Sequence, residues 1–438
     1  MKSLLYRIIP AGRTARDVLR VLSGSLATTA LNFFVSIGIA RLVSVDAYGL
    51  FGTANVMLTL VPMVVDAGLS VSLVRFLGDG RHDRRQLLST ILTVKLLTGA
   101  VMVLAALLLR EPLAVALFGS DDHALLLVIV AVGCAIANVA MALQAYSQAG
   151  RDFVGFTLQT LLPTLVKCIA VLVLVITSTV SLLSVVAVTS LATVTGLVYG
   201  IWRHRRDLTP QPSPAVLGQL LAFGKWIALT GILSALLMRT DMFMLTVYGD
   251  SRQVGFYYAA FQLAFAFPLV TMSVTNVLLP MATGIRGAEE RRRYVHRVLR
   301  FTPVVAALAA AVVLLAPVVV PLLFGQRYVA AAAPFAILAS VFILGMIVTP
   351  LGLVILSINR PELQTFTFLV QLAVNVVVDY LLIPQQGATG AAWGTFAAKV
   401  AGALLTFLLV RRYVFGREGC RQRHDGAADE QARIGVAK

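Results

Sequence analysis

Long apolar segments alternate with short polar ones along the whole chain. Most of the apolar segments have 20 residues or more, and a helix needs about 20 residues to cross the hydrocarbon core of a bilayer. The pattern therefore predicts an all-α integral membrane protein with about twelve transmembrane helices. The predicted spans are 22–42, 50–74, 87–109, 124–148, 155–177, 181–202, 217–248, 253–280, 297–324, 330–357, 363–384 and 388–410.

Basic residues are distributed unevenly between the two sides that twelve spans create. Of the 36 Lys and Arg residues, 28 fall on the side of the N-terminus or at the adjoining helix edges, four fall on the opposite side, and four lie within spans. Loops rich in Lys and Arg stay in the cytoplasm. Both chain ends are therefore predicted to be cytoplasmic, in a protein of the cell membrane. Missing or adding one span would abolish the asymmetry.

The spans divide into two groups of six. Gly49, Ala54 and Pro62 recur 206 residues later as Gly255, Ala260 and Pro268, at the same place relative to the predicted spans. This favours two six-helix lobes related by a parallel repeat, with a binding site between them. The predicted parts are a cytoplasmic N-terminal segment (1–21), an N-lobe (22–202), a cytoplasmic linker (203–216), a C-lobe (217–413) and a disordered cytoplasmic tail (414–438).

Composition excludes several classes of protein. Hydrophobic residues make up 59% of the chain and charged residues 13%, against about 25% charged in soluble domains. The net charge of +16 follows from the cytoplasmic loops, so nucleic acid is not expected as a partner. The three cysteines form no CxxC pair, and no HExxH, GxSxG or P-loop motif occurs. Neither a metal site, a cofactor nor a catalytic residue is predicted.

Short motifs occur in three parts of the chain, in an order that covers nearly its whole length. They are residues 41–51 with Asp66-Ala67-Gly68-Leu69, Arg239-Thr240-Asp241 with Val254-Gly255-Phe256-Tyr257, and Asn359-Arg360-Pro361 with residues 379–384 and 387–392. Together they resemble the oligosaccharide flippases, the polysaccharide biosynthesis transporters of the multidrug/oligosaccharidyl-lipid/polysaccharide exporter superfamily. The resemblance is specific for the family and not for a substrate.

This resemblance implies a V-shaped pair of lobes around a central cavity. It also implies a function, in which a polyprenyl-pyrophosphate-linked saccharide crosses from the cytoplasmic to the outer leaflet by alternating access. Cationic residues would hold the pyrophosphate, and an ion gradient would drive many members. Polysaccharide polymerases and glycosyltransferases would be the partners.

Four basic residues lie within the predicted spans, where a charge costs about 2.5–3.5 kcal/mol on insertion scales and is a functional candidate. Charge-assisted bonds from such cations to phosphate are strong. Each cation has an alternative role, since it can pair with a buried acid or extend to the membrane interface. The predicted cavity cations are Lys95, Lys167, Arg239 and Lys399.

Three acids also lie within spans, and a coupling role and a structural role are both open for them. Asp66, Asp241 and Asp379 could bind a coupling proton or sodium ion. Gln371, Asn375 and Asp379 recur every four residues and form a polar stripe, which must face protein or water. Asp379 and Lys399 lie on consecutive helices and could form an ion pair.

Two other functions are weighed against the flippase. A drug/cation antiporter of the same superfamily would favour a net acidic site, whereas these spans carry four bases against three acids. A membrane polysaccharide polymerase or ligase would need a sizeable outer loop with catalytic residues. The largest predicted outer loop is short and holds Asp121, Asp122 and His123.

Overall fold

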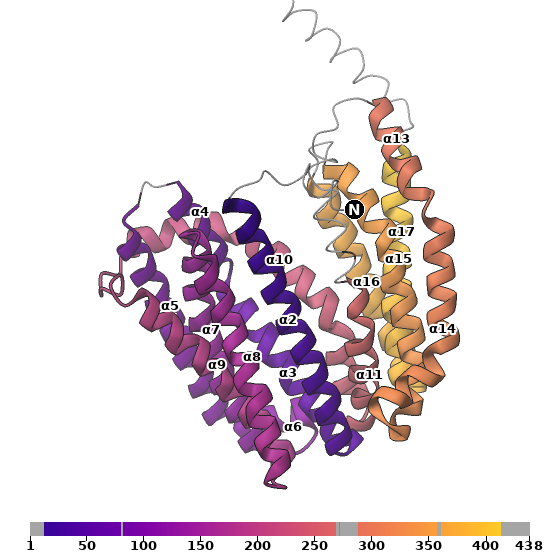
Figure 1. The fold of residues 1–438 in the computed structure, drawn as a ribbon, viewed down its shortest axis with the longest axis horizontal. Coiled ribbons are helices and arrows are strands. Elements are labelled where there is room, and N and C mark those ends of the chain that lie inside the picture. Colours follow the sequence, from indigo (N-terminus) through magenta and orange to yellow (C-terminus); the bar gives the residue numbers. More distant parts are fainter. Residues whose placement is uncertain (1–12, 80–81, 269–270, 272–287, 357–360, 413–438) are drawn as a thin grey trace, which may run out of the picture. The chain divides into compact units, whose positions relative to one another are not determined.

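The computed structural model describes residues 13–79, 82–268, 271, 288–356 and 361–412 (Figure 1). The long apolar segments are helices, and no strand occurs within these ranges. In chain order the elements are α2 (Arg13–Leu42), α3 (Val45–Asp66), α4 (Leu69–Gly78), α5 (Arg84–Leu108), α6 (Arg110–Phe118), η1 (Asp121–His123), α7 (Ala124–Ala149), α8 (Phe153–Ile176), α9 (Leu182–His204), α10 (Pro214–Tyr248), α11 (Ser251–Ala264), α13 (Ala288–Leu299), α14 (Thr302–Phe324), η2 (Gln326–Ala331), α15 (Ala332–Leu356), α16 (Pro361–Gln386) and α17 (Ala388–Val410).

Eleven helices in the described part of the chain are long and apolar enough to cross a membrane. The protein is therefore a multi-pass membrane protein, as predicted. The predicted span 253–280 begins as α11, and most of its remainder lies outside the described residues. The N-terminal residues 1–12, the motif residues Asn359 and Arg360, and the predicted tail 414–438 also lie outside them.

The predicted span 50–74 is two helices instead of one. The chain breaks at Ala67 and Gly68, both of which adopt the left-handed conformation, with φ of 47° and 75°. A Cβ at Gly68 would lie 2.6 Å from the carbonyl oxygen of Gly224, so α10 approaches closely at this point. The Asp66 carboxyl group accepts a hydrogen bond from the backbone N–H of Ser70 at 3.2 Å. This bond satisfies one of the N–H groups in the first turn of α4. A periodicity argument misses this break because both helices are apolar.

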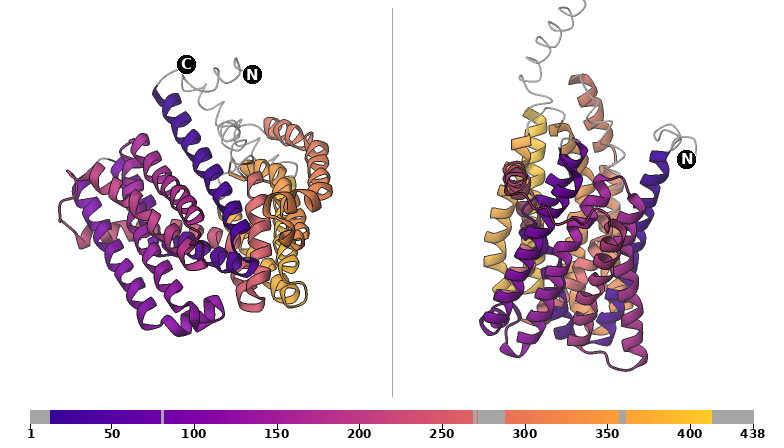
Figure 2. Two further views of the ribbon diagram at one scale, coloured as in Figure 1. Left: turned by 60° about the horizontal axis from the view of Figure 1, so that its bottom comes forward. Right: turned by 90° about the vertical axis from the view of Figure 1, so that its left-hand side faces the viewer.

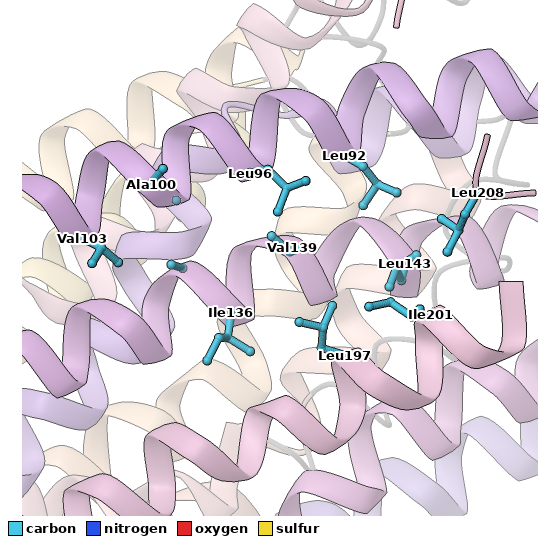
Figure 3. Close-up of a pocket in the computed structure, with 12 residues that line it drawn as sticks. Leu92, Leu96, Ala100, Val103, Ile136, Val139, Leu143, Leu197, Ile201 and Leu208 are labelled. Atoms are coloured by element: carbon cyan, nitrogen blue, oxygen red, sulfur yellow. The ribbon is translucent and has the colours of Figure 1, made fainter. Parts of the chain in front are cut away.

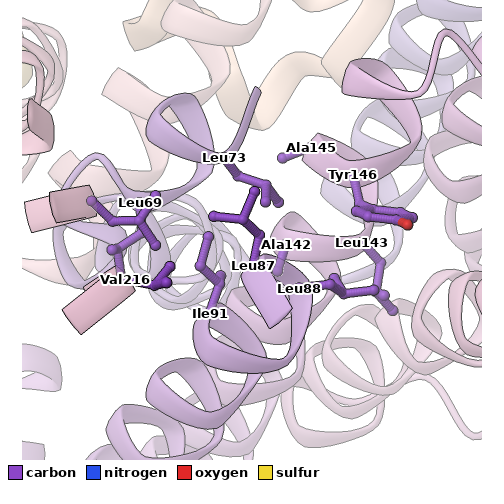
Figure 4. Packing of buried hydrophobic residues seen from close by; sticks show 11 residues of the cluster. Leu69, Leu73, Leu87, Leu88, Ile91, Ala142, Leu143, Ala145, Tyr146 and Val216 are labelled. Atoms are coloured by element: carbon purple, nitrogen blue, oxygen red, sulfur yellow. The ribbon is translucent and has the colours of Figure 1, made fainter. Parts of the chain in front are cut away.

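The described helices form two compact units, each with its own core. Unit 1 comprises residues 1–235 and 250–255, and unit 2 comprises 236–249 and 256–438, so α10 contributes to both. In unit 1, α4, α5, α7 and the start of α10 converge on one apolar cluster (Figure 4). Its buried members are Leu69, Leu73, Leu87, Leu88, Ile91, Ala142, Leu143, Ala145, Tyr146, Val216 and Leu220.

In unit 2, α14, α15, α16 and α17 pack side by side, coloured orange to yellow in Figure 2. The short helix α13 is amphipathic, and its apolar face is buried: Tyr294, Val295 and Val298 pack against α15 and α17. Many large apolar side chains elsewhere are exposed, such as Leu314 at 78% and Leu108 at 73%. In a bilayer these side chains face lipid, which explains why exposing them is not costly.

Candidate functional site

The densest polar cluster of unit 2 is built around Asp241 of α10, which is 3% exposed. Its Oδ2 accepts hydrogen bonds from the hydroxyls of Tyr257 and Thr395, each at 2.5 Å. Its Oδ1 accepts a hydrogen bond from Nδ2 of Asn375 at 2.6 Å. Three donors from α11, α16 and α17 therefore satisfy the carboxyl oxygens of Asp241 within the helix bundle.

A second carboxyl group, that of Asp379, lies in the same cluster and is fully buried. Its strongest charge interaction is with Asp241. Among the described residues, no N–H group or hydroxyl donates a hydrogen bond to either carboxyl oxygen of Asp379 or to Oδ1 of Asn375. The two carboxyl groups can bond directly to each other only when one is protonated. Because an unpaired buried polar group is costly, these oxygens are suited to bind a proton or a metal cation.

The polar residues of the predicted stripe on α16 lie on a buried face. Gln371, Asn375 and Asp379 are 6%, 1% and 0% exposed. They lie one turn apart because their spacing of four residues nearly matches the helical repeat of 3.6. The stripe is covered by α17, the helix that follows α16 in the chain.

Glycines on α17 allow the polar stripe to pack closely. A Cβ at Gly394 would lie 1.7 Å from Oδ1 of Asp379, and a Cβ at Gly402 would lie 2.4 Å from Cδ of Gln371. No larger residue fits at either position without displacing the polar side chain that it meets. Small residues at such spacing are how membrane helices approach each other.

Lys399 lies one turn after Thr395 on α17, and its electrostatic interaction is with Asp241. The predicted ion pair between Lys399 and Asp379 is not formed, since neither oxygen of Asp379 has a hydrogen-bond partner in the part of the chain that the structure describes. The reason is geometric: the carboxyl group of Asp379 is directed toward Asp241 and Gly394. The positive charge of Lys399 therefore offsets negative charge in the cluster through Asp241, and the oxygens of Asp379 are left without a hydrogen bond from Lys399.

Arg239, two residues before Asp241 on α10, also belongs to unit 2. Its guanidinium lies over the ring of Phe261, with 5.1 Å between Cζ and the ring centroid. Among the described residues, no carboxylate lies within ion-pair distance of it. Arg239 is thus a cation inside the membrane held by a cation–π contact, and its charge is available to an anion.

In unit 1, Lys95 of α5 is part of a closed network. Its ammonium donates to Oδ1 of Asp66 at 2.5 Å and to Oδ1 of Asn138 at 3.0 Å. Lys95 is 1% exposed, and Asn138 returns a hydrogen bond to the Lys95 carbonyl at 3.2 Å. Both charges are neutralised and buried, which favours the structural role for Lys95 and Asp66 over a place in the transport path.

Lys167 of α8 differs from Lys95, because it has no acidic partner among the described residues. Its ammonium donates to Oδ1 of Asn32 on α2. Asn32 in turn donates to the hydroxyl of Thr164 at 3.4 Å and to the Thr28 carbonyl at 2.9 Å. Amide and hydroxyl groups hold the ammonium in place but leave its charge uncompensated.

Four further residues of these clusters escaped the sequence prediction because they are uncharged and form no polar stripe at helical spacing: Asn32, Asn138, Tyr257 and Thr395. Polar residues in apolar spans are too frequent in this chain to be singled out individually. Two of them carried a usable signal, since Tyr257 lies in the repeated motif at 254–257 and Thr395 is one turn from Lys399. The other two are recognised only by their bonds to Lys167 and Lys95.

The sequence profile of a family described as polysaccharide biosynthesis protein matches residues 39–333, more than half of the chain. The chain belongs to this family. The match covers all of the α3–α9 region and extends through α14, so it includes Asp66, Lys95, Lys167 and Asp241. A search of curated proteins gives no match.

Solved structures show the fold of the chain. An inward-facing MATE family multidrug resistance transporter of the MOP superfamily aligns with a TM-score of 0.70 and 17% identity, over 88% of this chain and 94% of that one. The lipid II flippase MurJ, in an inward closed conformation, aligns with a TM-score of 0.72 and 16% identity, over 89% and 87%. A MOP superfamily transporter from Pyrococcus furiosus aligns with 0.61 and 17%, over 92% and 97%. The fold is that of the MOP superfamily.

Proposed function

We propose that the protein is a flippase that moves a polyprenyl-pyrophosphate-linked oligosaccharide from the cytoplasmic to the outer leaflet by alternating access, for polysaccharide biosynthesis. The observation that carries the proposal is that two intramembrane cations, Lys167 of unit 1 and Arg239 of unit 2, each have no carboxylate within ion-pair distance among the described residues. Each cation can bind a phosphate group of the substrate. The family membership supports the polysaccharide context.

The acidic cluster of unit 2 supports a second part of the proposal, a site for a coupling ion. Asp241 and Asp379 lie within the spans, where ionisable groups mark proton and ion pathways. The unpartnered oxygens of Asp379 and Asn375 and the hydroxyl of Thr395 are hard ligands for a proton or sodium ion. Binding there would neutralise the repulsion between the two carboxyl groups and change the packing of α16 on α17.

The test is the leaflet distribution of lipid-linked saccharide in cells depleted of the protein, measured with a membrane-impermeant lectin. Completed units are expected to accumulate on the cytoplasmic side. Expression of the wild-type chain is expected to remove the accumulated units. Lys167→Ala and Arg239→Ala are each expected to reduce transfer about tenfold or more, because a charge-assisted bond contributes about 1.5–3 kcal/mol. Arg110→Ala is the matched control, because Arg110 is exposed and pairs with Glu111 outside the spans.

Three outcomes contradict the proposal. Normal transfer to the outer face in depleted cells rejects the flippase and favours a drug/cation antiporter. Single repeat units that accumulate outside favour a polymerase. Full transfer by both alanine variants, at normal protein levels, rejects the role of the two cations in binding pyrophosphate.

A further inference from the structure

An apolar groove runs along the side of unit 1 between α5, α7 and α9 (Figure 3). Its volume is about 540 Å³, and every residue that lines it is apolar. Leu208, in the segment after α9, closes one end. The lining residues are Leu92, Leu96, Gly99, Ala100, Val103, Ala135, Ile136, Val139, Leu143, Leu197, Ile201 and Leu208.

The groove forms because the backbones of α5 and α7 lie close together near Gly99, whereas larger side chains separate the helices further along. A Cβ at Gly99 would lie 3.3 Å from the Cβ of Ala135, so the backbones nearly touch there. Toward Leu208, the rim is formed by Leu96 and Ile201, which are 59% and 44% exposed. These residues belong to helices that span the membrane, so the groove opens to the hydrocarbon region.

The end of the groove near Leu208 is rich in arginine. Arg85 is the second residue of α5, two turns before Leu92, and its Nε lies 3.9 Å from Oδ1 of Asp207, the neighbour of Leu208. Arg205 and Arg206 are exposed, and Cζ of Arg205 lies 6.0 Å from the centroid of the Trp202 ring. Trp202 is 58% exposed, as is typical of aromatic residues at the membrane interface.

Nearby carboxylates neutralise only part of this charge. Asp207 accompanies Arg85, Asp152 pairs with Arg203 at 2.8 Å, and Asp83 caps α5 through the N–H of Arg85. Arg205 and Arg206 have no carboxylate within ion-pair distance among the described residues. A basic pocket between helices at a membrane interface binds the headgroup of an anionic lipid.

We propose that this groove binds one acyl chain of an anionic phospholipid, with the phosphate at Arg205 and Arg206. The apolar lining suits an acyl chain, and the exposed Arg205 and Arg206 beside Leu208 complement the charge of a phosphate.

The experiment uses the full chain in vesicles of phosphatidylglycerol and phosphatidylcholine, with a trace of phosphatidylglycerol that carries a diazirine on its acyl chain. After photolysis, labelled peptides are mapped by mass spectrometry. Label is expected on α5, α7 and α9 around Leu92, Val139 and Ile201. Ala100→Phe, which fills the groove from an exposed position, is expected to remove most of it. Val101→Phe changes the neighbouring residue, which is 65% exposed and lies outside the groove. This variant is expected to leave the labelling unchanged.

The headgroup is tested by competition. Arg205→Gln with Arg206→Gln is expected to reduce the preference for the phosphatidylglycerol probe over a phosphatidylcholine probe about fivefold per charge removed, the factor that corresponds to about 1 kcal/mol per arginine. Arg300→Gln, an exposed arginine of unit 2, is the control. If Ala100→Phe does not fold, Leu96→Trp fills the same groove from an exposed position.

The proposal is overturned by label spread evenly over the lipid-exposed helices, or by label that persists in both groove-filling variants. An unchanged headgroup preference in the double arginine variant also overturns it. Stronger labelling of the groove by a diazirine polyprenyl phosphate than by the phospholipid probe would assign the groove to the tail of the transported substrate instead.

Discussion

An ionised side chain inside the membrane must either be neutralised by the protein or be reached by water, ions or substrate. Both cases occur among the four intramembrane cations. Lys95 is neutralised by Asp66, whereas Lys167 and Arg239 are held by an amide and by an aromatic ring. Residue type alone does not separate the two cases; the partner does.

The Lys95–Asp66 pair is expected to contribute strongly to stability. Lys95→Met leaves the Asp66 carboxylate buried without its counter-charge, a change that typically lowers the free energy of unfolding by about 3–5 kcal/mol. The double variant Lys95→Met with Asp66→Asn removes both charges and is expected to recover most of the loss. The measurement is the thermal unfolding midpoint of purified protein. Lys167→Met is the control, because it leaves no carboxylate unpaired, and equal shifts for Lys95→Met and Lys167→Met would contradict the structural role.

Asp379 is expected to be essential for ion coupling but not for folding. Asp379→Asn removes the titratable carboxyl group whose oxygens have no partner among the described residues and keeps the size of the side chain. Transfer of lipid-linked saccharide is expected to lose its dependence on the proton or sodium gradient, while protein levels stay normal. Gln371→Leu, on the same stripe but two turns away, is the comparison. A gradient dependence that survives in Asp379→Asn would reject the coupling site.

At the scale of helices, two features decide where the functional groups lie. The break at Ala67 and Gly68 ends α3 and places the Asp66 carboxylate over the start of α4, within reach of Lys95. The glycines of α17 bring α16 close enough for Asn375 and Asp379 to share a cluster with Thr395. In both cases, a small residue determines the position of a polar one.

Gly394→Ala is expected to abolish transport although alanine favours helix formation by about 1 kcal/mol over glycine. The added Cβ would lie 1.7 Å from Oδ1 of Asp379, so the carboxyl group or the whole of α17 must move. Gly345→Ala on α15 is the matched control, since its Cβ would meet only the Thr349 hydroxyl at 3.9 Å. Transport and unfolding temperature of both variants are measured. Normal transport by Gly394→Ala would show that the cluster tolerates displacement.

At the scale of the whole molecule, the predicted orientation follows from the distribution of Lys and Arg. In a chain whose three cysteines are replaced by serine, Asp122→Cys is expected to react with an impermeant maleimide in intact cells. Arg206→Cys is expected to react only after permeabilisation, because the segment between α9 and α10 is predicted to be cytoplasmic. Both positions are exposed, so access alone does not distinguish them. The reverse pattern of labelling would invert the topology and the proposed direction of transport.

The sequence by itself determined the class of protein, because the length and hydrophobicity of a span are local properties that the bilayer imposes. It also determined the charged candidates, since few charges occur in spans, and the stripe on α16, since its spacing is helical. Only the tertiary structure decided which charges are paired. Lys95 meets Asp66 across 29 positions of sequence, and Asp241 meets Asn375 and Thr395 across 134 and 154. Such contacts depend on how helices pack, which no local pattern specifies.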